Sequence, residues 1–238
     1  KVVRELGSVA DPDCQRVEVD GRPIEDERRV YLVLHKPRGV VTTLSDPEGR
    51  PTVAELVQSV GVRVVPVGRL DWDTSGTLLM TNDGDFAATL QHPRSQAPKV
   101  YRAKVSGHFD EGTLRRWRQS IEIDGRLTRP ATVKVTSLDV DDPWIEVTLH
   151  EGRNRQVRRL GEAAGTPVVR LVRVSQAGIG CEGLRPGEWR FLSREELEVL
   201  ARRYGVPRQH SQPGPAPGRP KSSPRHAPVR DSAGRLPR

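Results

Sequence analysis

Aromatic side chains make up only 4% of this 238-residue chain, and cysteine occurs only twice, as Cys14 and Cys181. Few aromatics argue against a base-stacking sheet of the RRM or OB type, because such a sheet needs several exposed rings. Two distant cysteines exclude a disulfide scaffold and the common structural zinc sites, and they fit a reducing, cytoplasmic compartment. No stretch approaches the roughly 18 consecutive apolar residues of a membrane-spanning helix, so we expect no membrane partner.

The excess of positive charge is unevenly distributed. The formal net charge is +8, and residues 205–238 carry +6 of it together with 8 of the 20 prolines. This segment has too few apolar residues to offset the entropy of ordering it, so we predict a disordered, basic, proline-rich tail. In the remainder, residues 151–173 carry a net +4, and this arginine-rich segment is the main basic feature of the folded part. An anionic partner is therefore expected to bind there.

Hydrophobic patterning predicts an α+β fold with a mixed, largely antiparallel sheet and flanking helices. Alternating, β-branched segments predict strands at residues 30–35, 100–105, 132–138, 144–150 and 168–174, and an apolar centre predicts a fully buried strand at 77–81. Helices are predicted at 51–59, 85–91, 111–118, 154–164 and 193–204. Asn154 and Ser193 are the expected N-caps of the last two helices, and Ser193 forms a capping box with Glu196.

The most informative loop lies between two predicted core strands. The strand at 64–67 leads into Gly68-Arg69-Leu70-Asp71, and Trp72-Asp73-Thr74-Ser75-Gly76 turns the chain into the buried strand at 77–81. An acid held between two core strands combines the precision of a catalytic group with access for a substrate. From composition alone, however, a loop aspartate is more often a turn or capping residue. The pair Asp71 and Asp73 lacks a nearby His or Glu to complete a metal site, so we expect no metal.

Four ordered blocks then carry a resemblance to a known family. They read YLVLHKPRGVVTT at 31–43, GRLDWDTSG with TNDG, HP and KVYRAKV at 68–105, EGRNRQVRRL at 151–160, and GLRPGEWRFL at 183–192. Together they resemble the pseudouridine synthases, in particular the RsuA/RluB branch that modifies ribosomal RNA. The resemblance implies a pseudouridine synthase catalytic domain at 30–204 with a central catalytic cleft. It further implies that residues 1–24 are the C-terminal remnant of an S4-like RNA-binding domain, followed by a linker at 25–29.

The resemblance also assigns roles to individual residues. Asp71 matches the catalytic aspartate, Arg158 the basic residue that pairs with it, and Tyr101 the tyrosine that contacts the target base. Arg69 matches the arginine that fills the space left by a flipped nucleotide. Without the resemblance, Arg158 reads equally well as part of a solvated helix face, Tyr101 as a core residue, and Arg69 as a phosphate contact or structural ion pair. We expect further RNA contacts from the basic turn at Lys36 and from the arginine-rich segment, at Arg153 and Arg155.

The leading hypothesis is therefore a cytoplasmic, monomeric enzyme that needs no cofactor. It isomerises a uridine of ribosomal RNA, the large-subunit 23S rRNA, either free or in a pre-ribosomal particle. One alternative is a non-catalytic RNA-binding or ribosome-assembly protein on the same fold. The matching aspartate, tyrosine and arginine argue against that alternative. A second alternative is a glycosidase or sugar-transferring enzyme that uses Asp71 and Asp73. The arginine-rich segment and the missing metal ligands disfavour this alternative.

Overall fold

A computed structural model describes residues 15, 17–23, 27–136 and 142–206. Most of the predicted S4-like remnant and nearly all of the predicted tail therefore lie outside the described residues, and both remain predictions. Inside the described part, residues 18–23 form a small hairpin of β1 (Glu18–Val19) and β2 (Arg22–Pro23), whose turn at Asp20 and Gly21 has positive φ angles. Two successive residues with positive φ are what a tight two-residue hairpin turn requires.

Residues 31–191 are built around one nine-stranded sheet with the order β13-β3-β5-β11-β6-β10-β9, to which β4 and β12 add at β5 and β11. All strand pairs in it are antiparallel except β5 with β11. The predicted α+β fold with a mixed, largely antiparallel sheet is thus confirmed. The strands are β3 (Tyr31–Lys36), β4 (Val65–Pro66), β5 (Thr74–Thr81), β6 (Lys99–Val105), β9 (Thr132–Val135), β10 (Trp144–Leu149), β11 (Val168–Gln176), β12 (Ile179–Gly180) and β13 (Trp189–Phe191).

The helices begin mostly where their capping residues predict. Ser193 and Glu196 form the expected capping box of α5, and Thr52 with Glu55 forms another at α1. The expectation that Asn154 caps α4 is wrong, because α4 starts two residues later and its N-cap is Arg155. The helices are α1 (Val53–Leu56), α2 (Gly84–Gln91), α3 (Glu111–Trp117), α4 (Gln156–Ala163) and α5 (Arg194–Tyr204), with 3₁₀ turns at Gln58–Val60 and Pro93–Ser95 and a short β7 (Glu122–Ile123) and β8 (Arg126–Leu127) hairpin.

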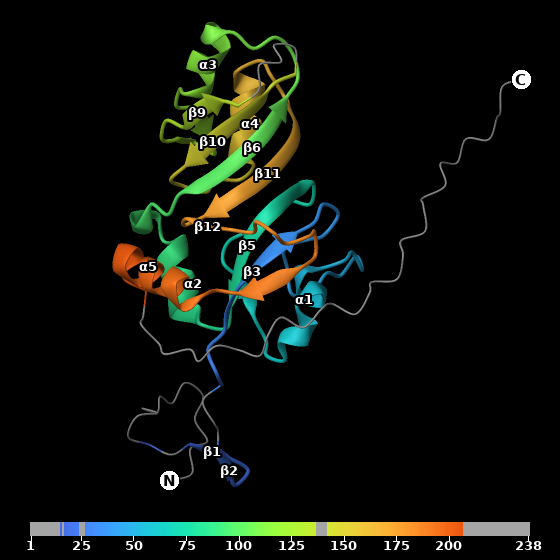
Figure 1. The fold of residues 1–238 in the computed structure, drawn as a ribbon, viewed down its shortest axis with the longest axis vertical. Coiled ribbons are helices and arrows are strands. Elements are labelled where there is room, and N and C mark those ends of the chain that lie inside the picture. Colours follow the sequence, from blue (N-terminus) through green and yellow to red (C-terminus); the bar gives the residue numbers. More distant parts are fainter. Residues whose placement is uncertain (1–14, 16, 24–26, 137–141, 207–238) are drawn as a thin grey trace, which may run out of the picture.

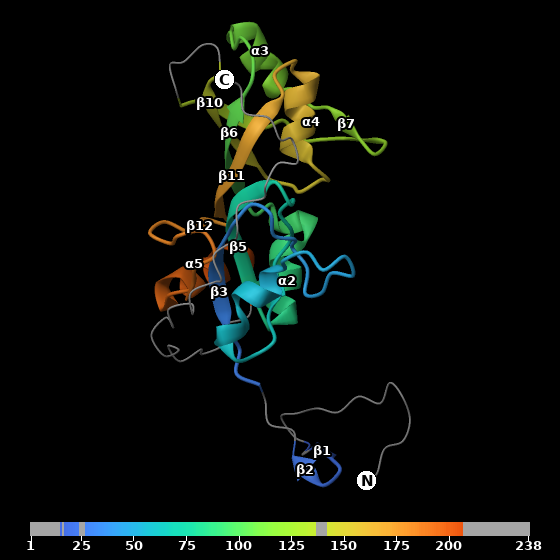
Figure 2. The same cartoon turned by 90° about the vertical axis from the view of Figure 1, so that its right-hand side faces the viewer.

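The sheet has two halves (Figure 1). One cluster of buried apolar residues packs on the half with β6 and β10, and two clusters pack on the half with β3 and β5. In one half, α3 and α4 cover one face of β6, β9, β10 and β11, and Figure 2 shows no helix of the described residues on the other face. In the other half, α1, α2 and α5 surround β3, β5 and β13. All eight residues of β5 are buried, as predicted for its apolar centre. The parallel pair β5 and β11 joins the two halves.

The folded part extends slightly further than the sequence indicated. Gly205 ends α5 in the left-handed conformation, and Val206 is buried in the same core as α5. The predicted start of the tail at residue 205 is therefore wrong by two residues, because Val206 packs instead of entering solvent. Within the described residues, no helix has both the length and the apolar character needed to cross a membrane.

Candidate active site

The Asp71 loop connects β4 to β5 at the junction of the two halves of the sheet. Leu70 is buried, and its backbone carbonyl accepts a hydrogen bond from Thr42 Oγ1 at 2.7 Å. Immediately after it, Asp71 to Thr74 form a tight turn that is closed by a hydrogen bond from Thr74 N to Asp71 O of 3.1 Å. Asp71 is thus held between a buried leucine and the first residue of β5, while its side chain remains about one-third exposed. This is the pinned but accessible acid that the sequence predicts.

Lys36 supports this turn from inside the protein. Its side chain is completely buried, and Nζ donates to the carbonyl oxygens of Pro37, Asp71 and Thr74 at 2.9 to 3.0 Å. The expectation that Lys36 contacts RNA is therefore wrong for this structure, because all three of its N–H donors are used within the protein. Burial lowers the pKa of Lys36 to about 8, although the nearby negative charges of Asp71 and Asp73 oppose this shift.

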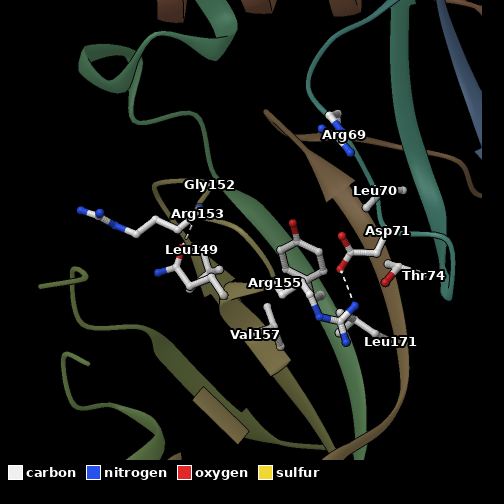
Figure 3. A pocket seen from close by; sticks show the side chains of 12 residues that line it. Arg69, Leu70, Asp71, Thr74, Leu149, Gly152, Arg153, Arg155, Val157 and Leu171 are labelled. Carbon is white, nitrogen blue, oxygen red and sulfur yellow. Dashed lines mark hydrogen bonds and ion pairs between the residues drawn. The ribbon is translucent and has the colours of Figure 1, made fainter. Parts of the chain in front are cut away.

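Two arginines from the start of α4 pair with the acids of the loop, and Figure 3 shows one of them, Arg155, beside Asp71. Arg155 Nη1 lies 3.6 Å from Asp71 Oδ2 and 3.8 Å from Asp73 Oδ1. Arg158 Nη2 lies 2.8 Å from Asp73 Oδ2, so the expected pairing of Arg158 with Asp71 is wrong in this structure. Because α4 begins only at Gln156, Arg155 takes the left-handed N-cap conformation (φ 49°) and its guanidinium reaches Asp71.

Arg158 differs from Arg155 in its burial and in its additional partners. Its side chain is 9% exposed, whereas that of Arg155 is 45% exposed. Arg158 Nη1 also donates to the carbonyl of Val168 at 3.1 Å, so its guanidinium links α4 to β11 and to the Asp73 side of the loop. A solvated position for Arg158 is thereby ruled out. The ion pairs of Arg155 are long and exposed, and such pairs are individually weak.

A small pocket of about 70 Å³ lies between the Asp71 loop and α4. Four of the residues expected to bind RNA or substrate line it together with Asp71, namely Arg69, Tyr101, Arg153 and Arg155. Arg69 is exposed at its edge, whereas Arg153 is held by Glu151, with 3.4 Å from Nε to Oε2, and by the carbonyl of Leu127. Tyr101 packs against the hydrophobic cores of both halves and also borders the pocket. Both interpretations of Tyr101, core residue and base contact, are therefore compatible with its position.

Arg173 is a buried residue of the site that the sequence did not single out. It lies on β11 opposite Tyr101 of β6 and Gly76 of β5, and its Nε donates to Thr77 O at 2.8 Å. Its exposed fraction is only 1%, and its Nη2 has no hydrogen-bond partner. The sequence did hold a signal for the burial of Arg173. Arg173 follows the apolar Leu171 by two residues in a predicted strand, so both side chains lie on the same, inward face.

The acids of the site are neutralised by arginines, and no metal cluster accompanies them. Across the described residues, no group of three or more His, Cys, Asp or Glu side chains is arranged to hold a metal ion. The arrangement is an accessible carboxylate in a pocket whose other charged residues are arginines. Such a site suits the binding of a nucleic acid and chemistry at an electrophilic carbon or an acidic C–H bond.

Comparison with known proteins agrees with this geometry. A sequence profile described as RNA pseudouridylate synthase matches residues 30–163. An uncharacterized RNA pseudouridine synthase of Aquifex aeolicus is 41% identical over 207 residues, which cover 87% of this chain and 83% of the relative. Ribosomal large subunit pseudouridine synthase B of Bacillus subtilis is 43% identical over 202 residues, covering 84% and 82%.

Among solved structures, a crystal structure of a pseudouridylate synthase superimposes with a TM-score of 0.65 at 29% identity, over 75% of this chain and 76% of that one. The pseudouridine synthase fold expected from the motifs is thus confirmed. The matches of sequence and fold cover the Asp71 loop, α4 and the sheet junction together, and the chain belongs to the RNA pseudouridylate synthase family.

Proposed function

We propose that this protein isomerises a specific uridine of large-subunit ribosomal RNA to pseudouridine, with Asp71 as the catalytic carboxylate. The observation that carries this proposal is the position of Asp71. It is the accessible acid of a rigid turn, it borders the pocket with Tyr101, and it faces Arg155 of α4. The similarity to a ribosomal large subunit enzyme of B. subtilis supports the choice of RNA.

The reaction needs no co-reactant. The N1–C1′ glycosidic bond breaks, the detached uracil turns over, a C5–C1′ bond forms, and the proton lost from C5 is balanced by one gained at N1. An ionised carboxylate can begin this sequence by adding to C1′ or by removing a proton from the sugar, and we assign this step to Asp71. Water has to be kept away from the detached sugar, because otherwise the site would act as a glycosidase.

The neighbouring side chains divide the remaining tasks. Tyr101 offers a ring that can stack on uracil at the pocket wall, and Arg69 at the pocket edge can occupy the space of a flipped nucleotide. Arg155 and Arg153 are available for phosphate contacts, since both border the pocket. Arg158 holds Asp73 and β11 in place, so its contribution is to position the loop that carries Asp71. We further propose that the chain acts as a monomer in the cytoplasm, on free rRNA or a pre-ribosomal particle.

The substitution Asp71→Asn tests the proposal. We expect it to abolish pseudouridine formation on an unmodified large-subunit rRNA transcript, because the amide can neither add to C1′ nor accept a proton at neutral pH. RNA affinity is expected to stay within about threefold of wild type, since phosphate contacts supply most of the binding energy. Pseudouridine is mapped on the transcript, and affinity is measured by filter binding.

Asp85→Asn is the matched control, because Asp85 is an exposed acid in the first turn of α2. It should convert the same uridine at the wild-type rate. Conversion by Asp71→Asn would show that another group is the catalytic acid. A wild-type protein that binds the transcript but converts no uridine would favour a non-catalytic RNA-binding role.

A further inference from the structure

The fold leaves one aromatic side chain in solvent. All ten aromatic residues of the chain lie in its described part, and nine of them are buried or half-buried. Trp72 is the exception, with 45% of its surface exposed. Tryptophan normally buries most of its large apolar surface, so an exposed indole directly after Asp71 requires an explanation.

Mobility of the loop does not explain the exposure, because the backbone on both sides of Trp72 is held. Trp72 occupies the second position of the turn that the Thr74 N to Asp71 O hydrogen bond closes. Buried Lys36 binds the carbonyls before and after it, at Asp71 and Thr74. The carbonyl of Trp72 itself accepts a hydrogen bond from Gly39 N at 2.9 Å. The protein therefore presents the indole from a rigid support.

The indole also rests against a neighbouring turn. A Cβ at Gly39 would meet Trp72 Cζ2 at 3.8 Å, so the ring lies on the Gly39 backbone where no side chain intervenes. Arg38, next to Gly39, and Arg69, three residues before Trp72, are both exposed. A rigid aromatic ring flanked by exposed arginines has the composition of a stacking platform for an unpaired base of RNA.

We propose that Trp72 stacks on an unpaired nucleotide adjacent to the target uridine and thereby helps to select the sequence and shape around it. The Cα atoms of Asp71 and Trp72 are only about 3.8 Å apart, so a base on the indole is close enough to belong to the nucleotide next to the one at Asp71. This inference rests on the proposed function for the presence of RNA in the pocket. Stacking on one aromatic ring typically changes affinity by about tenfold.

The test is a double-mutant cycle between the protein and the RNA. A fragment around the uridine mapped on the large-subunit transcript is prepared in three forms, intact and with an abasic nucleotide on the 5′ or the 3′ side of that uridine. Each form is titrated against wild type, Trp72→Leu and Trp72→Phe. Leucine keeps the apolar character without the ring, and phenylalanine keeps a ring, so the two variants form a matched pair.

We expect Trp72→Leu to bind the intact fragment about tenfold more weakly than wild type, and Trp72→Phe to stay within about threefold. With wild type, one of the two abasic fragments should bind about tenfold more weakly than the intact fragment. With Trp72→Leu, the same abasic fragment should bind as tightly as the intact fragment. The proposal is overturned if both abasic positions weaken wild type and Trp72→Leu by equal factors.

Fluorescence gives a second measurement that needs neither a folded leucine variant nor catalysis. The emission of Trp72 is obtained as the difference between wild type and Trp72→Phe, and stacking on a base should quench it during titration with RNA. If wild type converts no uridine of the transcript, the proposed function fails by itself. Quenching by the transcript then still supports stacking by Trp72, and unchanged emission overturns it.

Discussion

Lys36 and Asp71 show how one buried cation prepares a site for an exposed acid. Lys36 carries its ammonium into a region without solvent and binds the backbone of the turn, whereas the carboxylate of Asp71 remains accessible. The burial of a charged amine is costly unless every donor is satisfied, and here all three are. Lys36 therefore acts as a positioning residue for Asp71 and Trp72.

We expect Lys36→Met to destabilise the protein by about 3 kcal/mol at neutral pH, because three carbonyl groups lose a charged donor.

The difference in the free energy of unfolding between wild type and Lys36→Met should depend on pH. The pKa of Lys36 is about 8 in the folded protein against 10.5 for an ordinary lysine, so the unfolded state binds more protons between these values. Wild type therefore gains stability relative to Lys36→Met as the pH rises from 8 to 10.5. Urea unfolding of both proteins at pH 7, 8.5 and 10 measures this; a constant difference would mean that the pKa of Lys36 is not lowered by folding.

The pair of strands β5 and β11 is the element on which the site depends. It is the parallel pair of the sheet and joins its two halves. The Asp71 turn leads directly into Thr74 at the start of β5, and Arg173 lies further along β11. Gly76 lies opposite Arg173 with a φ of 112°, and a Cβ there would overlap the backbone carbonyl of Arg173. Close approach of the two backbones therefore requires glycine at this position.

Gly76→Ala is accordingly expected to destabilise the protein by more than about 3 kcal/mol, because strain at a positive φ adds to a clash with a backbone that cannot move away. Gly84→Ala is the matched control. Gly84 is the first residue of α2, and a Cβ there meets nothing within 4 Å. This control should be neutral or slightly stabilising. Urea unfolding midpoints compare the two, and a Gly76→Ala protein as stable as Gly84→Ala would contradict the close packing of β5 on β11.

On the scale of the whole molecule, charge is divided between a nearly neutral folded part and a basic C-terminal segment. Residues 207–238, which lie outside the described part, carry seven basic residues and one acid, and the first 206 residues carry a net charge of only +2. The basic residues at the pocket are arginines, and one of them, Arg155, pairs with the acids Asp71 and Asp73. We propose that the C-terminal segment adds a general attraction to RNA and that the pocket selects the uridine.

Deletion of residues 207–238 tests this division. The plot of log affinity for rRNA against log salt concentration should lose about 2 to 4 units of slope, because each phosphate contact contributes about 0.7 to 0.9 units. The mapped uridine should stay the same. Deletion leaves Val206 in place, so the core around α5 is preserved. An unchanged slope would mean that the segment makes no phosphate contacts, and a different modified uridine would mean that it contributes to recognition.

The elements of the fold and the candidate acid followed from local pattern. β-Branched alternation located the main strands, the apolar centre at 77–81 predicted burial on both faces, and Ser193 with Glu196 marked the start of α5. These features depend on residues close together in the chain, where strand and helix periods decide which side chains share a face. The position of Asp71 between two core strands also followed from such local patterns.

Only the tertiary structure decided which charges meet. The sequence did not reveal that α4 starts at Gln156. With this start, Arg155 forms an ion pair with Asp71, and Arg158 forms one with Asp73. Lys36 stands at the end of a strand, and the inward direction of its side chain follows from the turn at 71–74 that covers it. The same turn holds Trp72 in solvent. Contacts between residues 35 to 90 positions apart depend on the packing of whole elements, which is why local pattern located the acid but not its partners.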